Sequence, residues 1–134
     1  MIILLDADTC SYLIRQIPAV LKRCQEHMDA GDIIGISSIT AFELRYGIET
    51  KQPQVDAETF LVDLVENVKV HPFGIEAGFQ AALIRADQAK KGRPSGFYDP
   101  MLAGHAVALN AQLVTNNTKH FKDVPGLLLA NWME

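Results

Sequence analysis

The sequence predicts an α/β fold with a mostly parallel central sheet of four or five strands, and three observations lead to it. Short apolar runs alternate along the chain with longer segments of helical spacing. The first run, Ile2–Leu5, is continuously apolar, which is typical of a strand buried on both faces. The 134 residues contain no linker or low-complexity tract. We therefore expect one domain over residues 1–134, with helices covering both faces of the sheet as three α/β/α layers.

The N-terminal half supplies two strands and four helices. Asp8 is a good N-cap for the first helix, and Pro18 suits the first turn of the second. Ser37 or Ser38 can cap the helix that follows the second strand. In chain order, the predicted elements are a strand at 2–5, helices at 9–15 and 18–28, a strand at 33–36, a helix from 37 or 38 to 49, a polar loop at 51–56 and a helix at 58–67.

The C-terminal half continues the alternation. Gly92 ends an alanine-rich amphipathic helix, and Asp99-Pro100 is a strong helix-start pair. In chain order, the predicted elements are a strand at 68–70, a helix at 75–91, a loop at 92–98, a helix at 99–109, a strand at 112–115, a loop or short helix at 116–122 and a strand at 127–129.

Composition sets limits on function. The net charge is −4, which argues against a broad surface for coating nucleic acid but is compatible with an acidic active site that a metal neutralises. The two cysteines, Cys10 and Cys24, show no zinc-ligand spacing with the histidines, and we expect a reduced, cytoplasmic protein. The N-terminal apolar run is far too short for a signal peptide or a membrane span, so no membrane association is expected.

Three separated carboxylates are the strongest candidates for chemistry. Asp6 ends the first strand, and ligands gather at the carboxyl ends of strands in such sheets. Glu43 lies within a predicted helix, although Thr40-Ala-Phe-Glu43 also matches a capping box. Asp99 precedes Pro100, so capping alone could explain it. Each acid read singly therefore keeps a structural alternative.

Together, the three acids predict a hard cation. Two carboxylates about 4 Å apart repel by roughly 4 kcal/mol at an effective dielectric constant near 20, so a proton or a cation must join them. Oxygen ligands without cysteine favour Mg²⁺, with Mn²⁺ as a substitute. Such an ion can activate water and stabilise charge on a phosphodiester during hydrolysis. Phosphate-ester cleavage is the chemistry that the acids indicate.

Other polar residues carry weaker signals. Asn117 and Thr118 follow a predicted strand end, where ordinary turn chemistry suits them equally well. No nucleophile elbow, P-loop or dinucleotide-binding glycine motif is present. The histidines stand apart in the sequence, and we interpret each as packed or surface-exposed rather than catalytic: His27, His71, His105 and His120.

Five ordered motifs resemble the PIN domain, and in particular the VapC-type toxin ribonucleases of type II toxin–antitoxin pairs. The segments span nearly the whole chain, and together they are far more specific than any one alone. They are Leu5–Tyr12 (LDADTCSY), Ile39–Gly47 (ITAFELRYG), Lys91–Asp99 (KGRPSGFYD), Leu113–Phe121 (LVTNNTKHF) and the tail Val124–Trp132. The resemblance implies a PIN-like fold.

The resemblance also assigns roles. Asp6, Glu43 and Asp99 fall on the family's acids, which implies metal ligation by Asp6 and Asp99 with Glu43 as a further candidate. The fourth position of the family's catalytic set, usually Asp, is Asn117 here, which implies a catalytic residue that orients a water or a neighbouring acid rather than a metal ligand. Supporting roles fall to Asp8, Thr115 and Thr118, and Arg93 and Lys119 are candidate substrate contacts because they lie near the site in sequence.

The activity implied is that of a Mg²⁺- or Mn²⁺-dependent endoribonuclease acting as a toxin. The implied partners are an RNA substrate, a second copy in a homodimer, and a small inhibitory antitoxin through which the complex reaches operator DNA. Two alternatives stay open. A haloacid-dehalogenase-type phosphatase would use Asp6 and Asp8 in a DxDx[TV] motif, although Cys10 stands at its fifth position. A catalytically degenerate binding or dimerisation module is the other, favoured only by Asn117.

Overall fold

The computed structural model describes residues 1–51 and 57–134, so most of the loop predicted at 51–56 lies outside the described residues. Strands and helices alternate along the chain, and each predicted element is present with its ends shifted by at most two residues. The elements are β1 Ile2–Leu5, α1 Ala7–Ile14, α2 Pro18–Asp29, β2 Ile33–Ser37, α3 Ser38–Thr50, α4 Ala57–Asn67, β3 Lys69–His71, α5 Ile75–Lys90, α6 Asp99–Leu109, β4 Gln112–Val114, the 3₁₀ turn η1 Thr118–His120 and β5 Leu128–Ala130.

The sheet has five strands in the order β3-β2-β1-β4-β5, and every neighbouring pair is parallel. β1 lies at the centre, with Leu4 opposite Gly35 of β2 and Leu113 of β4. The chain builds outward from β1 on one side and then returns to place β4 on the other. This reversal is a topological switch point, where ligands gather beyond the carboxyl ends of the strands.

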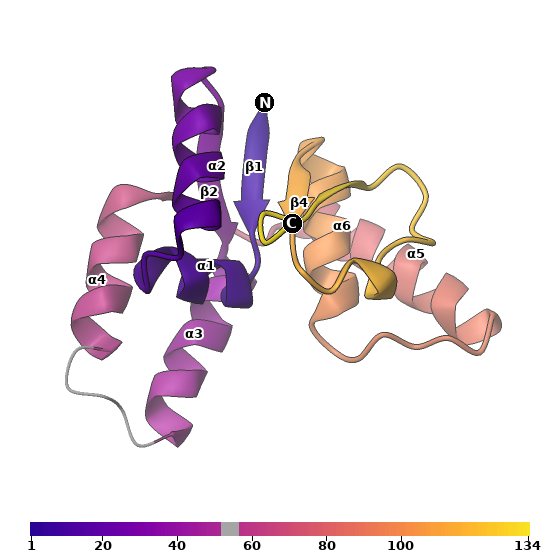
Figure 1. The fold of residues 1–134 in the computed structure, drawn as a ribbon. Coiled ribbons are helices and arrows are strands. Elements are labelled where there is room, and N and C mark those ends of the chain that lie inside the picture. Colours follow the sequence, from indigo (N-terminus) through magenta and orange to yellow (C-terminus); the bar gives the residue numbers. More distant parts are fainter. Residues whose placement is uncertain (52–56) are drawn as a thin grey trace.

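Helices cover both faces of the sheet, which confirms the predicted three layers. α1 to α4 lie on one side of β1 and β4, and α5 and α6 lie on the other (Figure 1). The side chains of β1 divide accordingly. Ile3 and Leu5 belong to the core cluster on the α1–α4 side, which also holds Trp132, and Leu4 packs into the cluster beneath α5 and α6. Alternate residues of one buried strand therefore fill two cores.

Glycine 104 sets the close crossing of α5 and α6. A Cβ atom at Gly104 would overlap the backbone of Ala81 on α5 and lie 2.8 Å from the Ala81 Cβ. The alanine-rich sequence of α5 and this glycine thus let the two helices approach closely. Because α6 begins at Asp99, the crossing helps to fix the position of that residue.

Two helix starts differ from the sequence prediction. The N-cap of α1 is Asp6 rather than Asp8, because the Asp6 side chain accepts a hydrogen bond of 2.8 Å from the backbone N–H of Thr9. At α6 the N-cap position is Tyr98, and Asp99 is the first helical residue with no capping hydrogen bond. Capping therefore explains Asp6 in part and does not explain Asp99.

The start of α3 follows the prediction. Ser37 caps the helix by accepting a 3.0 Å hydrogen bond from the Ile39 N–H. Thr40 therefore lies inside the helix, and the alternative capping box from Thr40 to Glu43 is wrong. Glu43 is left without a capping role.

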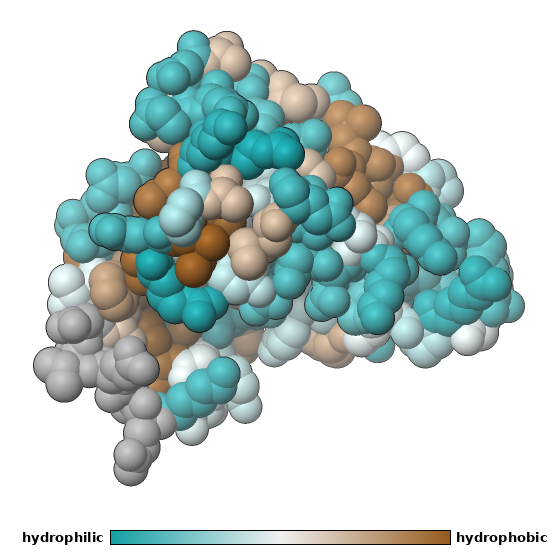
Figure 2. Space-filling view, viewed as in Figure 1, coloured by the Kyte–Doolittle hydropathy of each residue, from teal (hydrophilic) through white to brown (hydrophobic). Residues whose placement is uncertain are grey.

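The outer surface is mixed in character. Figure 2 shows a largely hydrophilic face on which hydrophobic side chains form separate patches. Within the described residues, no helix combines the length and the apolar character needed to cross a membrane.

Candidate functional site

Asp6 is held rigidly at the switch point. Its backbone N–H donates to Val114 O at 3.1 Å, which extends the pairing of β1 with β4 by one residue. The carboxylate is only 9% exposed. Burial raises its pKa, while hydrogen bonds from Thr9 and Thr115 act in the opposite direction. A buried carboxylate at a strand end, with its pKa raised, is a group that a nearby cation would stabilise in its charged form.

Glu43 faces the other acids from α3. Its Oε1 atom is buried and has no hydrogen-bond partner. Burial raises the Glu43 pKa to about 7, and repulsion from Asp99, Asp6 and Asp8 adds to the effect. Acids that stand far apart in the sequence therefore act on Glu43 through their charges.

Asp99 is the most open of the three acids and has a partner that the sequence did not reveal. Its side chain is 28% exposed, and its Oδ2 lies 3.0 Å from Nδ1 of His120. His120 is the last residue of η1, the turn that follows β4. The loop at the end of β4 therefore reaches the start of α6 through a histidine.

The remaining predicted residues separate into two groups. Thr115 is fully buried, and its Oγ1 accepts a 3.0 Å hydrogen bond from the Asn117 N–H. Asn117 is exposed, and its side chain makes no hydrogen bond among the described residues; Thr118 begins η1 without contacting an acid there. Asp8 is exposed, and it acts on Glu43 through its charge.

The three acids fit a hard cation. Their donors are all oxygen atoms, they repel one another, and one oxygen is buried without a partner. In the described part of the chain, no three Asp, Glu, His or Cys side chains lie close enough together to enclose an ion by themselves. Mg²⁺ does not need such a cage, because it keeps several waters and takes only one or two carboxylates together with substrate phosphates.

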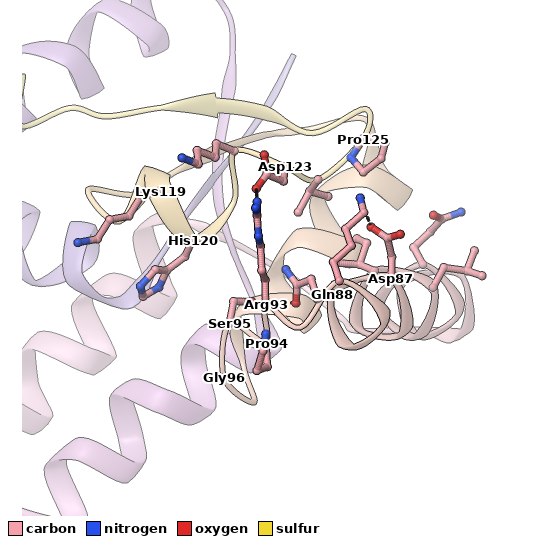
Figure 3. A pocket seen from close by; sticks show the side chains of 16 residues that line it. Asp87, Gln88, Arg93, Pro94, Ser95, Gly96, Lys119, His120, Asp123 and Pro125 are labelled. Atoms are coloured by element: carbon pink, nitrogen blue, oxygen red, sulfur yellow. Dashed lines mark hydrogen bonds and ion pairs between the residues drawn. The ribbon is translucent and has the colours of Figure 1, made fainter.

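A pocket of about 750 Å³ is lined by His120, the residue that contacts Asp99, and by none of the three acids themselves. Arg93 pairs with Asp123 at 3.2 Å across it, as Figure 3 shows, whereas Lys119 makes no ion pair within the described residues. Its charged lining consists of Asp87, Lys91, Arg93, Lys119, His120, Lys122 and Asp123. The candidate substrate contacts Arg93 and Lys119 thus share one pocket, which carries more basic than acidic groups in a chain of net charge −4.

Comparison with known proteins fits this geometry. Residues 3–127 of the chain match the PIN domain family. The chain belongs to the PIN-domain family. It is 34% identical over 132 residues to ribonuclease VapC2 of Rickettsia felis, and the match covers 98% of both chains. It is also 34% identical over 129 residues to the tRNA(fMet)-specific endonuclease VapC of Shigella flexneri, covering 96% of both.

The solved structures agree with the fold. The VapBC2 complex of Rickettsia felis, bound to a DNA fragment from its promoter, contains a chain that superposes with a TM-score of 0.88 at 33% identity. That match covers 98% of this PIN domain and 99% of the solved chain. The predicted resemblance to VapC-type PIN domains is therefore confirmed, as is the all-parallel α/β architecture.

Of the four histidines, only His120 contacts one of the candidate acids, and the sequence did not predict this contact. His71 and His105 are buried, and His27 pairs with Asp32 and stacks on Trp132, as packed residues do. His120 differs, because it contacts an acid of the site. Its position three residues after Asn117, at the end of the LVTNNTKH run, was the available signal, since the whole run follows a strand that ends at the switch point.

Proposed function

We propose that this PIN domain is an endoribonuclease that hydrolyses RNA phosphodiester bonds with Mg²⁺, for which Mn²⁺ can substitute. The observation that carries the proposal is the buried, unpartnered Oε1 of Glu43, whose pKa is raised by burial and then by the charges of Asp99 and Asp6. A site that concentrates negative charge without a partner is suited to a divalent cation. The relatives named as ribonucleases support RNA as the substrate class.

Asp6 and Asp99 would hold the ion, with Glu43 as a third ligand or as an acceptor for its bound water. When bound, such an ion lowers the pKa of water and neutralises charge that develops on the phosphate. The backbone N–H of Thr9 fixes the Asp6 carboxylate, so this proposed ligand needs little reorganisation. Glu43 can hold or release a proton at neutral pH, since its pKa is about 7.

The other predicted residues take supporting places. Thr115 holds the backbone of Asn117, and Asp8 adds negative charge that acts on Glu43. Asn117 is proposed to orient water rather than to bind the ion, because its side chain is exposed and carries no charge. Thr118 starts the turn that carries Lys119 and His120 toward the pocket.

The basic pocket is the proposed path of the RNA backbone. Lys119 and Lys122 have no ion-pair partner within the described residues, so their charges are available to phosphates. Arg93 already pairs with Asp123 and would exchange this exposed contact for a phosphate. Binding by lysines at the surface is independent of sequence and sensitive to salt.

The proposed biological role is that of a toxin held inactive by a small antitoxin. Support comes from the solved VapBC2 complex, which was captured on promoter DNA. By the same reasoning, this chain would reach operator DNA only through its antitoxin. A homodimer is also proposed, and the exposed apolar stripe of Ile75, Phe79 and Leu83 on α5 supports a protein contact on that helix.

The two alternatives fare differently. Membership of the PIN family, over almost the whole chain, argues against the haloacid-dehalogenase-type phosphatase. A degenerate binding module would neither bind metal at the acids nor cut RNA, so these two measurements distinguish it from the proposed ribonuclease.

The direct test is cleavage of an end-labelled RNA by the purified chain. We expect internal cuts with Mg²⁺ or Mn²⁺, none with a chelator, and none by the Asp99→Asn variant. Wild-type cleavage that persists in the chelator, or full activity of Asp99→Asn, would contradict the metal mechanism. Release of phosphate from small monoesters would favour the phosphatase instead.

A further inference from the structure

His120 lies at the junction between the acids and the basic pocket. Its Nδ1 is 3.0 Å from Asp99 Oδ2, and the residue also lines the pocket. Figure 3 shows His120 and Lys119 projecting from the same turn, apart from the pair of Arg93 with Asp123. A single imidazole therefore touches a proposed metal ligand and the proposed path of the RNA.

The turn that carries His120 is held in place by core packing and by backbone hydrogen bonds. Phe121, the next residue, is 2% exposed and packs into the core cluster beneath α5 and α6. Backbone hydrogen bonds from the His120 N–H to Asn117 O, at 3.0 Å, and from the Phe121 N–H to Thr118 O, also at 3.0 Å, close the turn. The imidazole is consequently presented by a fixed backbone, although the ring itself is 42% exposed.

Asp99 needs such a partner more than the other acids do. The Asp6 carboxylate is held by a backbone N–H and is buried, whereas Asp99 has no capping bond. Among the described residues, the contact with His120 is the only hydrogen bond made by the Asp99 side chain. A carboxylate that is ionised can only accept, so the imidazole donates from Nδ1. One oxygen of Asp99 is then engaged, and the other is left for an ion.

We infer that His120 is a positioning residue that fixes the Asp99 carboxylate for metal binding, a role that the sequence motif assigns to no histidine. Groups that hydrogen-bond a metal ligand orient it, and their loss typically weakens metal affinity or activity by about 10- to 100-fold. The inference rests on the proposed metal site. It separates His120 from Lys119, its neighbour on the same turn, whose proposed contact is with the substrate.

The test compares three substitutions by calorimetric titration of Mn²⁺ in the absence of RNA. His120→Ala removes the donor, and we expect Mn²⁺ affinity to fall by about 10- to 100-fold. His120→Asn can place an amide N–H near the position of Nδ1 and should restore most of the affinity. His120→Gln carries its donor farther out, near the position of Nε2, and should not.

The molecule offers a matched control. His27 makes the same kind of contact, with Nδ1 2.8 Å from Asp32 Oδ2, in a partly buried position near the end of α2. His27→Asn should leave Mn²⁺ affinity unchanged. Thermal unfolding of each variant checks that the comparison is made between folded proteins.

Kinetics with RNA separates positioning from substrate contact. Positioning predicts that His120→Ala lowers kcat at a given Mn²⁺ concentration, that added Mn²⁺ partly restores it, and that KM for RNA changes little. A raised KM with unchanged Mn²⁺ affinity would overturn the inference and make His120 an RNA contact. If wild-type protein bound no Mn²⁺, the proposed function itself would fail; if wild type and His120→Ala bound it equally, only this inference would fail.

Discussion

Asp6 and Asp99 approach the same site from two differently built regions. Asp6 is 9% exposed at the end of the central strand, and the backbone N–H of Thr9 holds its carboxylate. Asp99 is 28% exposed at the start of α6, and a single exposed histidine contacts it. One proposed ligand is thus part of the folded framework, and the other is adjustable.

Because the two acids are held differently, we expect substitutions of Asp6 and Asp99 to differ in their effect on stability although both lower activity. Asp6 caps α1, so removing its side chain costs capping energy as well as a ligand. Asp99 has no cap to lose. Both would bind the ion, yet only one is needed for the helix that it begins. Substitutions chosen with this distinction in mind can test each role by itself.

The largest expected effect is on catalysis. Asp6→Asn and Asp99→Asn each remove a charge from the proposed metal site, and each should lower RNA cleavage at least about 100-fold, because a bound ion contributes several kcal/mol to the transition state. The measurement is single-turnover cleavage of labelled RNA at fixed Mg²⁺. Retention of full activity by either variant would break the assignment of that aspartate as a ligand.

Stability should show the opposite pattern. Asp6→Ala loses the N-cap and should lower the free energy of unfolding by about 1 kcal/mol, whereas Asp6→Asn keeps a good cap and should cost much less. Asp99→Ala should leave stability nearly unchanged in the absence of metal. Urea unfolding of metal-free protein measures all three. Equal destabilisation by Asp6→Ala and Asp99→Ala would show that the two regions are not built differently.

Glu43 should make the free energy of unfolding depend on pH. In the folded state its pKa is about 7, above its ordinary value of 4.5, so the folded protein binds the proton more tightly. Its contribution to stability is therefore present below pH 4.5 and is lost as the pH rises through about 7. Because the side chain is partly solvated, we expect this loss to be about 1 kcal/mol.

Glu43→Gln isolates this effect. The metal-free variant should unfold at higher urea concentration than wild type at pH 8 and should show a flatter stability profile between pH 4.5 and 7. Identical profiles for the two proteins would mean that neither burial nor the neighbouring acids raise the Glu43 pKa in the folded state.

The basic pocket should give a smaller effect, on RNA affinity alone. Removing one phosphate contact lowers the slope of log affinity against log salt by about 0.7 for a single strand. Lys119→Ala should show this change in chelator, where no cleavage occurs. Lys22→Ala is the matched control, because Lys22 lies on α2 and pairs with Glu26. An unchanged slope for Lys119→Ala would place the RNA elsewhere.

Asn117 should give the smallest change. Its side chain is exposed and makes no hydrogen bond among the described residues, so Asn117→Ala should lower cleavage by no more than about tenfold, equivalent to about 1.4 kcal/mol. The same single-turnover assay measures it. A loss of cleavage as large as that of Asp99→Asn would indicate that Asn117 binds the metal.

The sequence predicted the elements well because hydrophobic periodicity is local. Ile2–Leu5 indicates a buried strand, and Pro18 and Asp99-Pro100 mark helix starts without knowledge of the rest of the chain. The choice of Asp6 rather than Asp8 as a cap was not local. It depends on the hydrogen bond from the Asp6 N–H to Val114, which carries the strand one residue farther before the helix begins.

The site was predictable only where motif and fold coincide. Asp6, Glu43 and Asp99 stand within motifs, and the fold brings their charges within range of one another. His120 meets Asp99 across 21 residues, through a 3₁₀ turn after β4. No spacing rule connects the two, so the contact emerges only when β4 and α6 are placed side by side.

Thermal unfolding during a titration with Mn²⁺ is the most direct test of the proposed metal site, because it needs neither the right RNA nor an antitoxin. Wild-type protein should gain about 2.7 kcal/mol at a free Mn²⁺ concentration 100-fold above Kd, or roughly 5–10 °C in Tm. Asp6→Asn, which keeps the helix cap, should show little or no shift over the same range. A wild-type Tm that stays constant up to millimolar Mn²⁺, or that rises equally in both proteins, would contradict a metal site built on these acids.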